Sequence, residues 1–538
     1  MIFLKTPRFL SLLLIFALLF AGSGCMKKDP DDPGNSDVNK NDTLVLAYDS
    51  DLFAEPLSAI TGQYSKTTGK KLSAAKSGKS LYEDAKAGSA GFYVVDAHSD
   101  LSDFYENELF SDLSTDSRFL STKLEIPNSL MLQNGKTGSY GVPLLLEAYG
   151  YIFDREVLQS LFEHENVTDL IDDLAACSYT DFEGFVVAVD TFIHAPSSAK
   201  VTVNGSDYRF SAEKTGKAAN LTGVFSVSAE SSRASEELLN VLLASRFNDR
   251  GEILDANEGG INTLAEVFPA YADVLDLHST YIAGKDGSVS RGDTFIGGDF
   301  SYTAAIDLFT GGYALFYPGS TADASDFKKS VAGFGTALDI IPMKLPLSDK
   351  EITANGMSAE KLNRSIVVGA RYYLAMNPKA NDTDRKAMTD FIGWLYGNEA
   401  GNKAYGSVFD ALPFNYSVTE PNAAAKSVMP ISENGASGTD TTGDTAGDVG
   451  GNTAGSTTEM NEEKPSANYA IQNSLMASVA RYFAKGDWIP AMTNALPSGW
   501  TSDVLGKNLN EYWGKEIWSG EDISAFTDRL LSGWTERI

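Results

Sequence analysis

The chain has 538 residues, 43% of them hydrophobic, so it is long enough for more than one compact core, and two or three domains are expected. Its 43 Lys and Arg residues are outnumbered by 72 Asp and Glu residues, which leaves a formal net charge of −29. Such a chain repels phosphate backbones and anionic membrane surfaces, which argues against nucleic acid as a partner.

The sequence contains two cysteines, Cys25 and Cys177, and four histidines. The histidines are well separated, and none stands at the spacing of a metal ligand from another histidine or from a cysteine. We therefore expect no disulfide framework, no bound metal and no cofactor. The sequence assigns no role to Cys177.

The first residues are typical of a secretory signal peptide. Lys5 and Arg8 precede an apolar run over residues 9–21, which is shorter than the roughly 20 residues that a membrane-spanning helix needs. The sequence GSGC at residues 22–25 resembles the lipobox of bacterial lipoproteins, except that Gly22 stands where that family usually has an aliphatic residue.

The lipobox resemblance implies that residues 1–24 are removed and that Cys25 becomes a lipidated N-terminus, with palmitate among its acyl chains. Residues 25–42 are polar and rich in Pro, Asp and Asn, so they cannot bury a core and are predicted to form a disordered tether. The mature protein would then be anchored to the extracytoplasmic face of the cell membrane. The alternative is a plain signal peptide followed by an incidental cysteine.

Strands alternate with helices after the tether. A β-rich run over residues 43–51 is followed by a helical pattern over 54–68, a short strand near 71–75 and a further run over 91–100. This alternation predicts parallel pairing in an α/β layer, where ligands bind at the carboxyl ends of the strands. The polar residues at those ends are Asp49, Asp51, Ser99 and Asp100, although the two aspartates equally fit a role as caps of the next helix.

The segment from Tyr140 to Asp154 is apolar on both faces if it is extended. One face carries Leu145, Glu147, Tyr149, Tyr151 and Phe153, and the other carries Leu144, Leu146, Ala148, Gly150 and Ile152. A glutamate in so apolar a run needs a partner, which makes Glu147 the strongest candidate for a ligand-facing side chain. Tyr149 and Tyr151 are interpreted as core residues.

Later segments include a strand pattern that begins at Arg364 and a helical pattern over residues 383–396. Residues 433–467 consist mainly of Gly, Thr, Ser, Asp and Glu and are predicted to be a disordered surface insertion. Residues 195–229 contain the sequence KVTVNGSDYRF, which predicts a local hairpin without an assigned role.

Two short motifs carry little information. SAAKSGKS, at residues 73–80, ends like a phosphate-binding loop but has Ser73 where the first glycine is required. RGD at residues 291–293 is a three-letter match. No G-x-S-x-G or H-E-x-x-H motif is present, so nothing in the sequence demands an enzyme.

Several segments, in order, resemble the extracellular solute-binding proteins of ABC importers, in particular the carbohydrate-binding family 1 that includes maltodextrin-binding protein. The similar segments are YGVPLLLEAYGYIFDREVL from Tyr140, YALFYPGS from Tyr313, VVGARYYLAMNPKANDTDRKAMTDFIGWLYGNEAGNKAY from Val367, DALPFNYS from Asp410 and GDWIPAMTNALPSGW from Gly486. The resemblance covers most of the chain from about residue 43, except 195–229 and 433–467.

The resemblance implies an α/β, two-lobed periplasmic-binding-protein-like fold (type II) whose lobes are joined by crossing hinge segments. The predicted segments are a lipoprotein signal peptide at 1–24, a tether at 25–42, the first part of lobe 1 at 43–140, the first part of lobe 2 at 141–312, the second part of lobe 1 at 313–370, and a segment at 371–538 that belongs mainly to lobe 2 and the C-terminal helices and contains the insertion at 433–467.

The resemblance also implies a ligand site between the lobes. Its predicted ligand-binding residues are Asp49, Asp51, Ser99, Asp100, Glu147, Tyr317, Arg371, Tyr372, Tyr373 and Trp500, with Trp500 as a stacking platform. Carboxylates would accept hydrogen bonds from sugar hydroxyls, and aromatic faces would cover the C–H side of the ring. A second platform that the family often has is missing from GSTADASDF after Tyr317, which disfavours a long malto-oligosaccharide.

The function implied is capture of a sugar by lobe closure and delivery to a membrane permease, by a monomer, without catalysis. Three alternatives stay open: a surface protein that serves a sensor or adheres to polymer, an importer component for a polyamine, amino acid or peptide, and a lipid-anchored glycan hydrolase. The excess of acidic residues is compatible with a cationic ligand.

Overall fold

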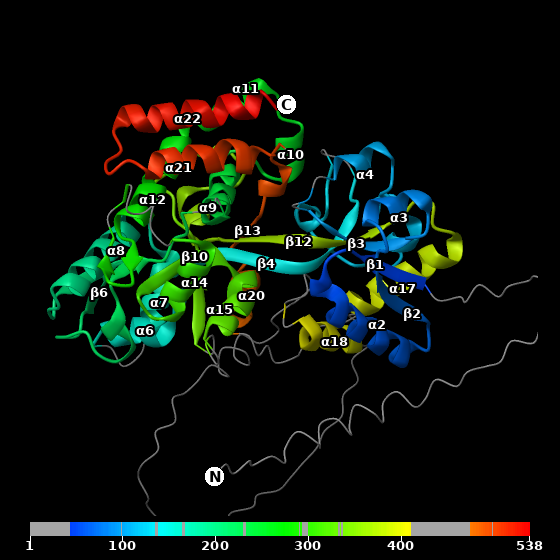
Figure 1. Cartoon of the computed structure of the whole chain (residues 1–538), viewed down its shortest axis with the longest axis horizontal. Helices are drawn as coiled ribbons and strands as arrows, with labels where there is room; N and C mark the ends of the chain where they lie inside the picture. Colours follow the sequence, from blue (N-terminus) through cyan, green and yellow to red (C-terminus); the bar gives the residue numbers. More distant parts are fainter. Residues whose placement is uncertain are drawn as a thin grey trace, which may run out of the picture. The chain divides into compact units, whose positions relative to one another are not determined.

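The computed structural model describes residues 44–97, 99, 101–134, 138–163, 167–229, 233–289, 291–292, 300–331, 334, 337–409, 411, 474–497 and 499–537. They belong to one compact unit, residues 43–538 (Figure 1). The predicted signal peptide, the lipid-bearing Cys25, the tether and the insertion at 433–467 lie outside the described residues.

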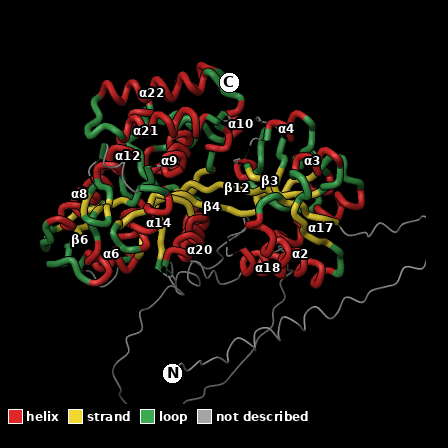
Figure 2. The backbone as a smooth tube through the Cα atoms, in the orientation of Figure 1, coloured by secondary structure: helices red, strands yellow, loops and turns green. Residues whose placement is uncertain are grey.

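Nine of the described strands form one mixed sheet in the order β2-β1-β3-β12-β4-β10-β7, with β11 also paired to β4 and β13 to β12 (Figure 2). The strands of this sheet are β1 (Leu44–Tyr48), β2 (Leu72–Lys76), β3 (Phe92–Asp96), β4 (Gly141–Asp154), β7 (Gly223–Phe225), β10 (Ala314–Ser320), β11 (Leu338–Ile341), β12 (Ile366–Met376) and β13 (Trp488–Pro490).

Two further strand pairs stand apart from this sheet: β5 (Lys200–Val203) with β6 (Ser206–Arg209), and β8 (Ala283–Gly284) with β9 (Gly287–Ser288). The first of them is the predicted hairpin, and its turn residues Asn204 and Gly205 both have positive φ.

Helices cover both faces of the large sheet (Figures 1 and 2). The described α-helices are α2 (Ala54–Thr68), α3 (Leu81–Ala87), α4 (Ser102–Glu106), α5 (Ser117–Leu120), α6 (Arg155–Leu161), α7 (Thr168–Ala176), α8 (Tyr179–His194), α9 (Arg233–Ala244), α10 (Arg250–Leu254), α11 (Glu258–Asn262), α12 (Phe268–Thr280), α14 (Tyr302–Thr310), α15 (Ala324–Ser330), α16 (Ala359–Arg364), α17 (Asp382–Gly397), α18 (Glu399–Phe409), α20 (Ser474–Lys485), α21 (Lys507–Trp513) and α22 (Gly520–Thr535). Among the described residues, none of these helices combines the length and the apolar character that crossing a bilayer requires.

The predicted alternation of strands and helices at the start of the unit is confirmed. β1 pairs in parallel with β2 on one side and with β3 on the other. Helix α2 has the predicted bounds because Leu57, Ile60 and Tyr64 recur on one buried face and Gly69, with φ of 72°, ends the helix in the left-handed conformation. The carboxyl ends of β1 and β3 therefore open at the same edge of the sheet.

Strand β4 divides the hydrophobic interior into two clusters, named here core I and core II. Its Leu146, Ala148 and Ile152 face core I, which also contains Leu46 and Phe92 of the N-terminal strands. Its Tyr149, Tyr151 and Phe153 face core II, which takes most of its members from residues 149–289 and 489–534. The predicted alternation along β4 is therefore confirmed, and one strand supplies both cores.

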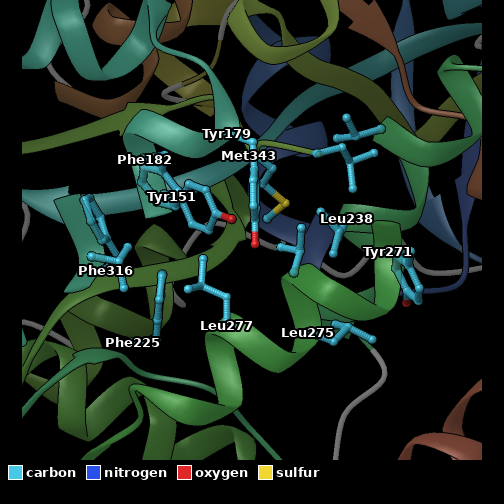
Figure 3. Close-up of a cluster of buried hydrophobic side chains, with 14 of the residues drawn as sticks. Tyr151, Tyr179, Phe182, Phe225, Leu238, Tyr271, Leu275, Leu277, Phe316 and Met343 are labelled. Atoms are coloured by element: carbon cyan, nitrogen blue, oxygen red, sulfur yellow. The ribbon is translucent and has the colours of Figure 1, made fainter. Parts of the chain in front are cut away.

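Core II is rich in aromatic rings around Tyr151, as Figure 3 shows. The Tyr151 ring stacks on Phe182 at 4.7 Å between ring centroids, and Phe225 and Phe316 each lie 5.8 Å from it. Its hydroxyl shares a 2.9 Å hydrogen bond with Nε2 of His278 on α12. Burial lowers the pKa of His278 from 6.5 to about 3, so the imidazole is neutral near neutral pH.

Two contacts bear on the predicted division into lobes, whose boundaries otherwise stay a prediction. Helices α17 and α18 pack near α2, so residues 382–409 lie with the N-terminal strands, although the prediction placed them mainly in lobe 2. Strand β10 pairs with β4 and β7, and residues 313–370, predicted to belong to lobe 1, contribute side chains to both cores. After β12 the chain contributes first to core I and then, through α21 and α22, to core II.

Candidate functional site

A cavity of about 320 Å³ opens where β1 and β3 end and where β12 passes them. Its walls come from four stretches of chain: the residues after β1, the start of α3, the end of β3 with the start of α4, and the middle of β12. The lining residues are Asp49, Ser50, Phe53, Leu81, Val94, Val95, Asp96, Ser99, Leu101, Phe104, Arg371 and Tyr372. The cavity therefore stands at the edge where the parallel strands predicted a ligand site.

A β-bulge in β12 places Arg371 and Tyr372 in the same cavity. Neighbours along a regular strand point to opposite faces, so two consecutive residues would not normally share a wall. The pairing of β12 with β4 shifts here, because Ala370 is opposite Leu146 while Tyr372 is opposite Leu145. Arg371 is the extra residue, and a bulge of this kind redirects the adjacent side chains.

Arg371 binds Asp96 in a bidentate ion pair on the wall of the cavity. Its Nε lies 3.0 Å from Oδ2 and 3.1 Å from Oδ1, and its Nη2 lies 2.8 Å from Oδ2. The hydrogen bond to Asp96 is the main cause that raises the pKa of Arg371, and the nearby Glu147 carboxylate adds to it. Both side chains keep partial exposure, 38% for Arg371 and 23% for Asp96, so the pair can also contact a ligand.

Asp49 is the other carboxylate of the cavity. It follows β1, is exposed, and its Oδ2 accepts a 3.1 Å hydrogen bond from the backbone N–H of Leu81 at the start of α3. Ser99 is also exposed, and its backbone N–H donates to the carbonyl of Asp96. Asp51 points elsewhere, because it forms a 2.7 Å ion pair with Lys76 and is not among the lining residues.

Aromatic and aliphatic side chains form the rest of the wall. Phe53 meets Tyr372 edge to face, with 4.6 Å between the ring centroids and 82° between the ring planes. Phe104 and Leu101 contribute from the start of α4, and Val94 from β3. The cavity thus combines two carboxylates, one guanidinium and the hydroxyl-bearing Ser50, Ser99 and Tyr372 with apolar rings. This combination suits a small ligand that carries polar groups on an apolar frame.

Three of the predicted binding residues are buried against protein partners instead of lining the cavity. Glu147 accepts hydrogen bonds from Ser320 Oγ at 3.1 Å and from the Tyr149 hydroxyl at 3.4 Å. Tyr317 donates to Asp323 at 3.3 Å, and the Tyr373 hydroxyl accepts a 3.0 Å hydrogen bond from Arg250. Each polar group is therefore satisfied within the protein. Asp100 lies outside the described residues.

The prediction that Trp500 is a stacking platform is wrong. Its side chain is fully buried, its Nε1 donates to the carbonyl of Leu530 at 3.1 Å, and its ring lies 5.2 Å from that of Trp534. A ring that has both faces inside core II offers no face to a ligand. A tryptophan in an amphipathic C-terminal segment can pack between helices as readily as it can line a cleft, and its residue type does not distinguish the two positions.

Asp96 is the main cavity residue that the sequence interpretation missed. It ends the apolar run FYVVD and carries the same signal as Asp49, a carboxylate at the end of a predicted strand, whereas the predicted site takes Ser99 and Asp100 from the same end. The apolar members of the wall, among them Phe53 and Phe104, carry no signal that separates them from ordinary core residues. Within the described part of the chain, no group of three or more His, Cys, Asp and Glu side chains is placed to hold a metal ion.

The family model described as bacterial extracellular solute-binding protein matches residues 74–430. Among proteins of curated function, none matches the sequence.

Solved structures share the fold at low sequence identity. The apo form of RafE from Streptococcus pneumoniae is 12% identical, with a TM-score of 0.54 over 94% of this chain and 100% of that chain. A family 1 extracellular solute-binding protein from Bifidobacterium longum subsp. infantis is 12% identical, with a TM-score of 0.51 over 92% and 99%. The bacterial solute receptor AcbH is 10% identical, with a TM-score of 0.53 over 91% and 98%.

These likenesses confirm the predicted α/β, periplasmic-binding-protein-like fold. Since the family model spans more than half of the sequence, the chain belongs to the bacterial extracellular solute-binding proteins.

Proposed function

We propose that this protein is the lipid-anchored solute receptor of an ABC importer, which captures a small carbohydrate outside the cytoplasm and delivers it to the permease. Membership of the extracellular solute-binding family supports the location and the general role. The lipobox at residues 22–25 supports the anchor at Cys25, and mass spectrometry of the mature N-terminus tests it.

The observation that carries the proposal is the mixed lining of the cavity. Asp49 and the pair of Asp96 with Arg371 offer acceptors and donors, and Phe53 with Tyr372 offers apolar rings beside them. A sugar presents the complementary surface, hydroxyls around a C–H frame. Each hydroxyl that finds a partner avoids the roughly 1–3 kcal/mol cost of an unpaired buried polar group.

The size of the cavity favours a small carbohydrate. A volume of about 320 Å³ stands at the lower end of the range of ligand pockets, about 300–1,000 Å³. AcbH, which shares the fold, is described as having an exclusive substrate preference for β-D-galactopyranose. A ligand of one or two sugar rings therefore fits better than a long oligosaccharide.

Capture by closure follows from the way the two cores are joined. Strands β4 and β12 run through both, so a rotation about these strands would move one core toward the cavity that the other carries. A ligand shifts the equilibrium between the open and the closed state only by binding the closed state better than the open state. Closure needs no bond to be made or broken, so we propose no enzymatic activity.

Calorimetric titration of the purified full-length protein with D-galactose, D-glucose and lactose tests the proposal. We expect at least one neutral sugar to bind, and Asp49→Asn to weaken that binding about tenfold, since an amide replaces an acceptor-only carboxylate. Asp207→Asn, on the β5–β6 hairpin, is the matched control and should bind as the original protein does. Equal affinity of the two variants would remove Asp49 from the site.

A cationic solute is the second candidate, because two carboxylates face one guanidinium in the cavity. The same titration with putrescine separates the two. If putrescine binds and none of the neutral sugars does, the cargo is an amine and not a carbohydrate. Hydrolysis of lactose by the purified protein during the titration would indicate a glycan hydrolase.

A further inference from the structure

Arg250 connects the two cores beside the bulge in β12. It is the first residue of α10, and Ile253 of that helix belongs to core II. The Arg250 side chain leaves core II and reaches Tyr373, the core I residue that follows the cavity's Tyr372. The whole residue is only 3% exposed.

The guanidinium of Arg250 has three acceptors, all of them neutral. Its Nη1 donates to the Tyr373 hydroxyl at 3.0 Å, and its Nη2 donates to the carbonyls of Ser129, at 3.3 Å, and Met131. Its carbon Cζ also lies 5.8 Å from the centre of the Tyr373 ring. Because the donor is a guanidinium, these hydrogen bonds are charge-assisted and stronger than bonds between neutral groups, so they hold Tyr373 and the carbonyls of Ser129 and Met131 to Arg250.

Helix α10 is joined to its surroundings by a short series of hydrogen bonds. Asp249 caps it by accepting from the N–H of Glu252 at 3.0 Å, and Glu252 in turn accepts from the N–H of Asn248 at 2.7 Å. Asn248 accepts a 2.8 Å hydrogen bond from the N–H of Asn355, which joins the turn before α10 to a distant loop. Arg250 therefore projects from a capped helix that is tied to a second segment of the chain.

The stretch that Arg250 contacts is irregular on one edge. The pairing of β12 with β4 shifts on both sides of Tyr372, first between Ala370 and Tyr372 and then between Tyr372 and Tyr373. The other edge pairs regularly with β3 from Tyr372 to Met376, so the irregularity is confined to the β4 side. Because Arg371 and Tyr372 both line the cavity from this stretch, a shift of Tyr373 would move them too.

On the basis of the proposed function, we propose that Arg250 is a positioning residue for ligand capture. It clamps Tyr373 to α10, and through Tyr373 it sets where Arg371 and Tyr372 stand in the cavity. Arg250 is not among the lining residues, so its effect on affinity would be indirect.

Three variants test this: Arg250→Met, Tyr373→Phe, which removes only the hydroxyl, and the double variant. With D-galactose, or whichever panel sugar binds, we expect Arg250→Met to weaken affinity about tenfold and Tyr373→Phe about fivefold. The double variant should bind no more weakly than Arg250→Met, because both changes remove the same link. Losses that simply multiply, or an unchanged affinity in Arg250→Met, would overturn the proposal.

Arg246→Met is the matched control. Arg246 is also buried, 8% exposed against 3% for Arg250, and stands four residues earlier, but its ion pair, at 2.9 Å, is with the exposed Glu266 of the turn at Thr263–Glu266. The control should lose stability without losing affinity. If both arginine variants weaken binding equally, the effect is general destabilisation, and the proposed positioning role of the Arg250–Tyr373 contact is refuted.

Hydrogen exchange on the unliganded protein decides the question without any sugar. Arg250→Met should speed amide exchange in residues 366–376, and Arg246→Met should not. If none of the panel sugars binds while this difference in exchange is seen, the proposed carbohydrate cargo is wrong, but the proposed role of Arg250 in positioning β12 is supported. If exchange is unchanged, the clamp fails whatever the cargo.

Discussion

Arg371 is the side chain whose chemistry is least replaceable in the cavity. Its planar guanidinium makes two parallel contacts with Asp96 and still keeps 38% of its surface exposed. A lysine would keep the charge but not the fork, so it cannot hold the carboxylate and face a ligand with fixed geometry. We therefore expect Arg371→Lys to weaken ligand binding about tenfold in calorimetric titration.

The control for this change is Arg118→Lys, which alters an exposed ion pair with Asp382 on α17 that is not part of the cavity. It should leave affinity and stability nearly unchanged, because exposed ion pairs contribute about 0–1 kcal/mol. An Arg371→Lys protein that binds as tightly as the original would show that the guanidinium fork is not used.

At the level of single residues, sequence reasoning recovered part of the cavity. Asp49 was predictable because it ends an apolar strand, and Arg371 and Tyr372 were carried over from the family resemblance. Neither route reveals that Arg371 and Tyr372 point into one cavity, since that depends on a bulge created by pairing with a strand more than 200 residues earlier in the chain. Glu147 has the predicted need for partners, but Ser320 and Tyr149 meet it.

At the C-terminal helices, the residue type of Trp500 suggests a ligand platform, but its position is that of a core residue. Trp500 joins α21 and α22 to core II, where its ring packs near Trp534 and its indole N–H is satisfied by Leu530. Trp500→Ala should therefore lower the free energy of unfolding by about 3–5 kcal/mol, through lost burial and a cavity that cannot fully collapse. Urea denaturation measures this loss.

Trp488→Ala is the comparison for Trp500. Trp488 is only partly buried, at the start of β13, where it stacks on Phe483. Trp488→Ala should therefore lower the free energy of unfolding by less than Trp500→Ala does. The folded Trp500→Ala protein should bind ligand as before. A loss of affinity without a loss of stability would restore Trp500 as a ligand platform.

Elements with strong local signals were the easiest to predict. Helix α2 and strand β4 were defined by repeating apolar positions and by a glycine or polar residue at the end, which act within a few residues of sequence. The sequence could not place α17 and α18 in the fold, because their position depends on packing against α2, more than 300 residues earlier. Periodicity specifies which face of a helix is buried but not against what.

For the molecule as a whole, His278 makes stability depend on pH. Its pKa is about 3 in the folded protein and 6.5 ordinarily, so between these values the unfolded chain binds a proton that the folded protein does not. The free energy of unfolding therefore falls as the pH is lowered from 6.5 toward 3. At about pH 4.5 this one group should account for about 3 kcal/mol of lost stability.

His278→Gln isolates this contribution, since glutamine can still hydrogen-bond to Tyr151 but does not titrate in this range. We expect the variant to lose less stability than the original protein between about pH 6.5 and 4.5, measured by thermal unfolding across that range. Parallel curves for the two proteins would mean that His278 is protonated without cost in the folded state.

Neither core is built from one continuous piece of chain. Core I takes residues from β1 through β4, then from α14, β10, α15 and β11, and again from β12, α17, α18 and α20, while core II takes most of its side chains from β4 through α12 and from the C-terminal segment. A fragment that stops before β12 would leave β3 without the neighbour it pairs with at Tyr93 and Val95, and such an open strand edge invites aggregation. Truncated versions intended for expression or crystallisation must therefore retain the chain from β1 through α22, because no single cut releases half of the molecule with its interior complete.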